Sequence, residues 1–475
     1  MKKENLADGV THIDDELVEK AGKAGAKGRR NYRSIFIKAG TAAACIVIAV
    51  TALWQKGIIN SPKESTLKTA EESKVSAYLL AKVAYPNGIH YDDLDSAIEN
   101  REKNPVDEDF KAAIEKFSFK SGARLLSENQ GNRLYSPMSL FYALSLAAEG
   151  ASGDTRKEMI NTLGIKEDGD LGTQCGNLYR ITYTEDEYSS LRIANSLWLD
   201  KSVAGQSIKY NEDYLKKAAQ SYYASVYEAD FEDEKTARNI GQWIQENTNG
   251  TLGKDYSVDP GTAMSLINTV YFKSQWIDKF DKRDTKNDKF YLEDGDTTDC
   301  DFMNRDKDMN RFSKGDGFTR SSLSLKNGSM DFILPDEGVS VDELIKTPES
   351  LEQCFTGGEE SYGEVTWSIP KFSYNTSMNM NEALQSLGME EPFSQGADFS
   401  NISDGGFYIS KIAQNTHVGI DENGVEASAF TEICYEGAAL VKGKAEMILN
   451  RPFIYGIRSE SGTLLFIGVC GNPSK

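Results

Sequence analysis

The chain has 475 residues, of which 39% are hydrophobic and 27% are charged, a balance typical of a soluble globular body. Its formal net charge of −20 argues against nucleic acid as a partner, because a phosphate backbone requires a basic binding surface. Length alone would suggest several domains, at roughly 100–200 residues each.

The first hydrophobic segment, residues 35–54, is long enough to span a bilayer. It is apolar apart from Lys38 and a few small polar residues, and residues 20–38 carry seven Lys or Arg and no acidic residue. The positive-inside rule therefore predicts a single transmembrane anchor, with the basic tail of residues 1–34 in the cytoplasm and the large domain outside the cell. Residues 55–76, which are rich in Lys, Glu, Ser and Thr, are interpreted as a polar stalk.

Three other interpretations of residues 35–54 remain open. A cleaved signal peptide fits less well, because the basic region is long and no small-x-small cleavage site follows the apolar run. A lipoprotein cysteine at Cys45 would need a Leu at the usual preceding position, which is absent, and apolar residues continue beyond the cysteine. The third alternative is a buried core helix.

Helical periodicity predicts three long helices in the body that follows. The first spans residues 110–126, and the third is an amphipathic helix at residues 237–247. The second begins at Pro137, a residue favoured in the first turn of a helix, and residues 139–148 are nearly all apolar or small, which predicts burial. We also expect a short helix at residues 77–83.

Strand patterns alternate with these helices, so the predicted fold class is α+β. Residues 266–272 and 330–334 are predicted strands. Residues 453–458 and 464–470 are predicted to form two core strands that are joined by a Ser-Glu-Ser-Gly turn.

A long, weakly patterned segment extends from Glu422 to Phe453, and a loop of this length is usually functional or disordered. Its first part alternates, so that one face of an extended strand would carry Val425, Ala427, Ala429 and Thr431. The other face would carry Glu426, Ser428 and Phe430. The first face has no large or charged side chain, and the segment could therefore enter a packed sheet. An ordinary surface loop is the alternative.

Catalytic and metal-binding patterns are absent from the sequence. The three histidines have no metal-binding spacing, and there is no G-x-S-x-G elbow, P-loop or dinucleotide glycine pattern. Of the six cysteines, Cys45 lies in the predicted anchor and five lie in the body, again without metal-like spacing. We therefore expect no cofactor, no metal and no enzymatic activity, and at least one body cysteine without an intramolecular partner.

Five segments occur in a fixed order along the body: Tyr135–Leu144, Ile267–Trp276, Leu387–Ser400, Asp421–Ala429 and Arg451–Pro473. In this order, and over roughly residues 77–475, they resemble the serpin family of serine protease inhibitors. The resemblance implies one domain with three β-sheets, eight or nine helices and an exposed reactive-centre loop.

The resemblance also assigns roles to individual residues. The hinge of the loop corresponds to Glu422, Gly424, Val425, Glu426, Ala427, Ser428 and Ala429. The polar cluster beneath the opening of the main sheet, called the shutter, corresponds to Ser136, Ser139 and Asn268. The family often has a histidine at a fourth shutter position, and gap-free counting back from Gly424 places Gln414 there. Trp276 corresponds to the tryptophan of the breach, where insertion begins.

In this family the scissile bond lies about fourteen residues beyond the hinge glycine, which gives Ala438-Ala439 here. The loop looks slightly longer than usual, so Leu440, Lys442 and Lys444 are alternatives. The resemblance implies a suicide-substrate inhibitor of extracellular serine proteases. A small residue at the scissile bond suits the shallow pocket of elastase-like or subtilisin-like enzymes. A non-inhibitory serpin-fold binding protein is the alternative function, and the predicted location is the outer face of a bacterial membrane.

Overall fold

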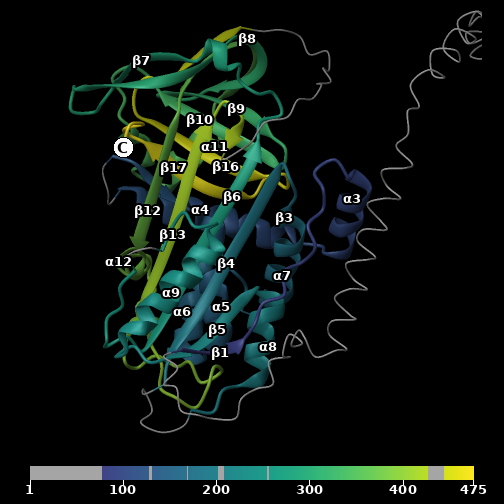
Figure 1. The fold of residues 1–475 in the computed structure, drawn as a ribbon, viewed down its shortest axis with the longest axis vertical. Coiled ribbons are helices and arrows are strands. Elements are labelled where there is room, and N and C mark those ends of the chain that lie inside the picture. Colours follow the sequence, from purple (N-terminus) through teal and green to yellow (C-terminus); the bar gives the residue numbers. More distant parts are fainter. Residues whose placement is uncertain (1–76, 128–130, 168, 202–207, 254–255, 426–442) are drawn as a thin grey trace, which may run out of the picture. The chain divides into compact units, whose positions relative to one another are not determined.

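The computed structural model describes residues 77–127, 131–167, 169–201, 208–253, 256–425 and 443–475 (Figure 1). These residues belong to one compact unit, Val75–Lys475. No helix within the described ranges is long and apolar enough to cross a membrane. The predicted anchor at residues 35–54 lies outside those ranges.

The first sheet has eight strands in the order β1-β5-β4-β6-β14-β13-β12, and β3 pairs with β4 beside this path (Figure 1). Its strands are β1 (Ala77–Ala81), β3 (Thr184–Glu185), β4 (Ser189–Asp200), β5 (Ala224–Ala229), β6 (Met264–Gln275), β12 (Phe372–Asn379), β13 (Ile409–Asp421) and β14 (Gly424–Val425). The long strands β4, β6 and β13 form its centre, and β6 pairs directly with β13 as well as with β14.

The second sheet has nine strands in the order β15-β11-β8-β9-β10-β16-β17-β2, and β7 pairs with β8 beside this path. Its strands are β2 (Arg133–Tyr135), β7 (Lys286–Tyr291), β8 (Thr297–Lys314), β9 (Phe318–Leu325), β10 (Gly328–Pro335), β11 (Glu359–Pro370), β15 (Lys444–Ile448), β16 (Phe453–Ser459) and β17 (Leu464–Cys470). Three sheets were expected, but the described residues form two hydrogen-bonded sheets. The reason is that β9 pairs with both β8 and β10, and so joins β15, β11 and β8 to β10, β16, β17 and β2 in one sheet.

The described residues contain ten α-helices, where eight or nine were expected, and two short 3₁₀ helices. The α-helices are α3 (Leu94–Lys103), α4 (Glu108–Ser127), α5 (Pro137–Gly150), α6 (Gly153–Leu163), α7 (Leu171–Thr182), α8 (Glu212–Ser221), α9 (Glu234–Asn247), α10 (Val341–Ile345), α11 (Pro348–Thr356) and α12 (Asn381–Ser386). The 3₁₀ helices are η1 (Lys282–Asp284) and η2 (Glu391–Phe393).

The three long predicted helices are confirmed as α4, α5 and α9. Ser136 caps α5 by accepting a hydrogen bond from the Ser139 backbone amide, and Pro137 follows in the first turn. Nearly every residue of α5 is buried, as its composition indicates. The four predicted strands are confirmed within β6, β10, β16 and β17.

The prediction of a short helix at residues 77–83 is wrong. Residues Ala77–Ala81 form β1, which pairs antiparallel with β5 at the edge of the first sheet. Leucine and alanine favour a helix locally, but pairing with a neighbouring strand supplies backbone hydrogen bonds that a five-residue helix cannot match.

Two apolar layers hold the first sheet. One face packs against α5 and the second sheet, as in the contact between the rings of Phe272 on β6 and Phe466 on β17, whose centroids lie 6.1 Å apart. The other face is covered by α9, whose Ile240, Trp243 and Ile244 pack onto strands β4, β5 and β6 (Figure 1).

The C-terminal end of β6 is attached to the second sheet. Trp276 forms an isolated β-bridge with Leu325 at the end of β9. The Lys326 amide donates to Gln275 O and the Ile277 amide to Ser324 O, both over 2.9 Å. This end of β6 is therefore fixed to β9.

Candidate functional site

The central seam of the first sheet lies between β6 and β13. The two strands pair in parallel from Met264 and Ile409 as far as Val270 and Thr416, and beyond that point they diverge. The short strand β14 lies in the gap and pairs antiparallel with both neighbours, so that Val425 faces Ser274 on one side and Ile420 on the other. Gly424 and Val425, near the start of the long segment, thus already form part of the sheet.

A tight turn connects β13 to β14. The Asp421 carboxylate accepts hydrogen bonds from the backbone amides of Asn423 (2.7 Å) and Gly424 (3.3 Å). Gly424 has φ +151°, and a Cβ at this position would lie closer than 3.0 Å to atoms of Ser274, Gln275 and Trp276. Only glycine has both the required conformation and the required absence of a side chain.

Trp276 holds this turn, and this is the residue assigned to the breach. Its side chain is buried, and its indole Nε1 donates to Asp421 O over 3.0 Å. Its backbone amide donates to Asn423 O over 3.0 Å. The ring lies against the aromatic rings of Phe280 and Phe332. Both ends of the turn are therefore bonded to one rigid residue.

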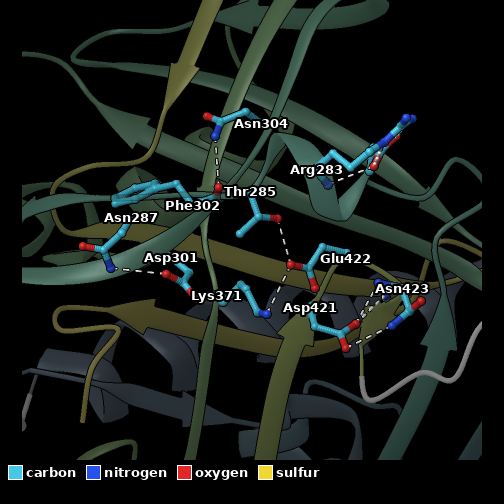
Figure 2. A network of polar contacts seen from close by, with 12 residues as sticks. Arg283, Thr285, Asn287, Asp301, Phe302, Asn304, Lys371, Asp421, Glu422 and Asn423 are labelled. Carbon is cyan, nitrogen blue, oxygen red and sulfur yellow. Dashed lines mark hydrogen bonds and ion pairs between the residues drawn. The ribbon is translucent and has the colours of Figure 1, made fainter.

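Glu422, within the same turn, is a buried carboxylate with specific partners (Figure 2). Its Oε1 accepts from the Thr285 hydroxyl over 2.8 Å and from Lys371 Nζ over 3.2 Å. Burial alone would raise the pKa of Glu422, but its backbone hydrogen bond and the bonds from Thr285 and Lys371 outweigh burial and hold this pKa below the ordinary value. The hinge glutamate is thus ionised and paired.

The network in Figure 2 connects the hinge to the second sheet. Thr285 precedes β7, and Lys371 lies between β11 and β12. The Lys371 amide donates to Asp301 O on β8 over 2.8 Å. The position of Glu422 therefore depends on three segments that are distant in sequence.

The four residues assigned to the shutter lie together in the structure, beneath the lower part of the seam. Gln414 on β13 accepts from the Ser136 amide (2.7 Å) and donates to Ser136 O (2.9 Å). It also donates to Asn268 Oδ1 on β6 over 3.0 Å, directly across the seam. A glutamine amide has one oxygen and two N–H groups, and all of these are used here.

Asn268 extends the network away from the seam. Its Nδ2 donates to Ser139 O over 3.2 Å and to Asn195 Oδ1 on β4 over 2.6 Å. Gln414, Asn268 and Asn195 are all buried. If one of their hydrogen bonds breaks, no water molecule is at hand to bond the freed polar atoms, and the break is therefore costly. The Ser139 hydroxyl is buried without a hydrogen-bond partner among the described residues.

Three contributors were missed from the sequence: Asn195, Thr285 and Lys371. A signal for Asn195 existed, because asparagine is disfavoured in strands and needs a hydrogen-bond partner when it is buried. Here it faces Asn268 in the neighbouring strand. No local pattern distinguishes Lys371 or Thr285 from the other lysines and threonines of the chain.

Part of the assigned site lies outside the described residues. This applies to the hinge residues Glu426, Ala427, Ser428 and Ala429, to the scissile bond Ala438-Ala439, and to the alternative scissile residues Leu440 and Lys442. The alternative scissile residue Lys444 is described, and it begins β15, where its Nζ lies 2.6 Å from Glu364 Oε2 on β11. The four described cysteines, Cys175, Cys300, Cys354 and Cys470, are buried and free.

The seam between β6 and β13 is thus closed from Met264 to Val270 and holds the two-residue strand β14 at its other end, and residues 426–442 follow β14 in the chain. Residues 112–473 match the family model described as Serpin (serine protease inhibitor). The chain belongs to the serpin family, whose members are generally protease inhibitors rather than catalytic enzymes.

Individual relatives agree with this assignment. Serpin-Z1C of Triticum aestivum is 30% identical over 370 residues, which cover 72% of this chain and 90% of the wheat protein. An uncharacterized serpin-like protein of Thermococcus kodakarensis is 31% identical over 375 residues, which cover 76% of this chain and 85% of that protein.

Solved structures show the same fold. The thermophilic serpin tengpin in its native state has a TM-score of 0.69 and 28% identity, with 84% of this chain and all of that chain covered. Serpin48 of Tenebrio molitor, described as highly specific, has a TM-score of 0.67 and 25% identity, with 77% of this chain and 98% of that chain covered.

Proposed function

We propose that the protein is a suicide-substrate inhibitor of extracellular serine proteases, in which the cleaved loop enters the seam between β6 and β13. The observation that carries this proposal is β14. Its two residues already pair with β6 on one side and β13 on the other, in the orientation that an inserting strand would need.

The register of β14 supports insertion along the whole seam. Each further loop residue would move one position back along both β6 and β13, which brings Thr431 between Asn268 and Gln414. Those two residues already face each other in the parallel ladder, so the strand could enter without any shift in register. Continued to Tyr435, the strand would reach Met264 at the start of β6.

The alternation of loop side chains fits the two faces of the sheet. In this register Ala427 would lie between Phe272 and Val418, which are both buried in the core. Glu426 would lie on the opposite face beside Lys273, where a carboxylate can stay in solvent. Small residues are needed on the first face, because the core has native packing density and little free volume.

The resemblance to serpins implies the following sequence of events. A serine protease attacks the exposed loop and forms an acyl-enzyme, which releases the N-terminal part of the loop from its C-terminal part. The released part replaces one parallel ladder between β6 and β13 by two antiparallel ladders, which are slightly more stable per residue. The attached protease is carried along the sheet and distorted before water can complete hydrolysis. The race between insertion and hydrolysis decides whether the protease is trapped.

The proposed scissile bond, Ala438-Ala439, would move beyond the far end of β6 in this register. Lys444 is a poorer candidate, because it is already paired in β15 and a protease needs an extended, accessible segment. An alanine at the cleaved bond suits elastase-like or subtilisin-like proteases, whereas trypsin-like enzymes require a cation.

The deciding experiment mixes the full chain with elastase-like, subtilisin-like and trypsin-like proteases and analyses the products on a denaturing gel. A denaturant-resistant complex with one of the first two classes is expected. Complete cleavage without any complex would reject inhibition and favour the alternative, a non-inhibitory binding protein. Mass spectrometry of the released fragment identifies the scissile bond, and a new N-terminus other than Ala439 would overturn that assignment.

We also propose that the serpin domain is held on the outer face of a bacterial membrane. The support for this location is the apolar run at residues 35–54 and the basic tail that precedes it.

A further inference from the structure

An N-terminal segment runs along the outer edge of the first sheet. We call residues 77–91 the N-terminal brace. Its first part is β1, which pairs with β5 from Ala77 opposite Ala229 to Ala81 opposite Val226. Its remaining residues belong to no helix or strand and continue toward the end of the sheet that carries β14 (Figure 1).

Tyr85 is the central contact of the N-terminal brace. Its ring stacks on Tyr179 and Tyr183 at the end of α7, with centroids 6.5 Å and 6.0 Å away. Its hydroxyl donates to Asn247 Oδ1 at the end of α9 over 3.3 Å, and Arg192 of β4 lies over its ring at 5.5 Å. One side chain therefore joins α7, α9 and β4.

Gly88 brings the main chain of the brace against β3. A Cβ at Gly88 would lie 2.5 Å from Glu185 O and 2.8 Å from Glu185 N. Any larger residue must lift the brace from β3, because the obstacle is backbone rather than a flexible side chain.

The upper end of the brace is attached beside the breach. The Tyr91 amide donates to Asp186 Oδ2 over 3.0 Å, and its ring packs edge-on against Tyr188. Lys326, which follows β9, donates to the Tyr91 hydroxyl over 3.0 Å and lies 4.2 Å from its ring centroid. The brace thus connects the first sheet with the second.

Opening the seam requires one group of elements to move together. β4 and β5 are hydrogen-bonded to β6 directly or in turn, and α9 packs across all three strands. The brace fastens this group to α7 and to Lys326. α7 in turn is fixed to the buried helix α5 by the Tyr142 hydroxyl, which donates to Cys175 O over 3.0 Å. Movement of β6 away from β13 must strain or break these attachments.

We propose that the N-terminal brace restrains separation of β6 from β13, and that Tyr85 is the positioning residue through which it does so. The brace then sets the rate at which a cleaved loop can enter. This inference deepens the proposed inhibitory function and rests on it for its consequence, although the restraint itself can be measured without any protease.

The test is amide hydrogen exchange on the uncleaved full chain, read by mass spectrometry. In Tyr85→Ala, exchange in residues 264–270 and 409–416 should rise about tenfold, the size expected from the loss of two aromatic pairs. Exchange in β16 and β17 of the second sheet should not change. Gly88→Val should act in the same direction, because it lifts the brace without removing a side-chain contact.

Two variants serve as controls. Tyr78→Ala alters the same segment at a residue that is 65% exposed. Amide exchange in residues 264–270 and 409–416 of this variant should equal that of the wild type. Tyr85→Phe keeps the ring stack and should restore most of the protection. The proposal would be overturned if amide exchange in residues 264–270 and 409–416 were unchanged in both Tyr85→Ala and Gly88→Val. It would also be overturned if exchange in β16 and β17 rose equally.

The protease experiment separates this inference from the proposed function. Where the wild type traps a protease, Tyr85→Ala should raise the ratio of trapped protease to cleaved, released inhibitor, and an unchanged ratio would overturn the control of insertion by the brace. If the wild type traps no protease, the proposed function fails, while the exchange measurement still decides whether the brace restrains the seam.

Discussion

Gln414 on β13 and Asn268 on β6 face each other across the seam, and the Gln414 amide donates to the Asn268 side-chain oxygen over 3.0 Å. This hydrogen bond crosses the line along which the sheet must separate. Strand insertion therefore has to break a buried polar contact, and the energy of that contact contributes to the barrier.

Removing the Gln414 amide should destabilise the closed sheet. Gln414→Ala leaves the Ser136 amide, Ser136 O and Asn268 Oδ1 without this partner, and a loss of about 2–4 kcal/mol of unfolding free energy is expected. Denaturant unfolding of the uncleaved protein measures it. Gln242→Ala, at an exposed position on α9, should change stability by no more than about 0.5 kcal/mol. Equal effects of the two substitutions would contradict the role assigned to Gln414.

Substitution at Ala427 tests the register of insertion. Ala427→Arg should leave folding and cleavage at Ala438-Ala439 intact but prevent trapping, because the guanidinium would enter the core between Phe272 and Val418 without a partner. The readouts are complex formation and the gain in thermal stability after cleavage. Ser428→Arg is the matched control, since the same side chain would lie on the opposite face, and it should still trap. Stable complexes with Ala427→Arg would show that the loop does not insert in this register.

The ion pair of Glu422 should make stability depend on pH. The pKa of Glu422 in the folded protein lies below its ordinary value of 4.5, so the ionised group stabilises the fold. That contribution is fully present above about pH 5 and is lost as the pH falls through the folded pKa. The stability difference between the wild type and Glu422→Gln should therefore be largest at neutral pH and shrink below pH 4.5. A difference that stayed constant from pH 7 to pH 3 would exclude an ionised pair.

Lys371 provides the complementary test. Lys371→Met leaves Glu422 buried without its cation and should cost about 1–3 kcal/mol of unfolding free energy, a figure reduced from that of a fully buried pair because Lys371 is partly exposed. The double variant Lys371→Met with Glu422→Gln should be more stable than the sum of the single losses implies. Strict additivity would mean that the two side chains do not interact.

Location is tested on intact cells. Protease treatment of the cell surface should remove the serpin domain and leave a membrane-bound fragment that contains residues 35–54. Recovery of the whole domain from the medium, with an N-terminus after residue 54, would support a cleaved signal instead.

The buried helices were predictable because their signals are local. The cap at Ser136, Pro137 and the apolar run that follows determine α5 within a few residues of chain. β1 was not predictable in this way, because its identity depends on pairing with β5 about 150 residues later. The shutter was assigned by resemblance, and Gln414 by counting along the chain. The partners of Glu422 could not be found, because Thr285 and Lys371 approach it only through the fold.

The attachment of β6 to β9 by Trp276 and its neighbours has a further consequence for motion. Beside this fixed end, β6 and β13 are already separated by β14, whereas from Val270 to Met264 the two strands are still hydrogen-bonded to each other. β14 begins at the held end, where the least displacement is needed. Insertion can then proceed one residue at a time from β14. Each newly paired residue separates β6 from β13 at the next position, so the two strands do not have to separate along their whole length at once.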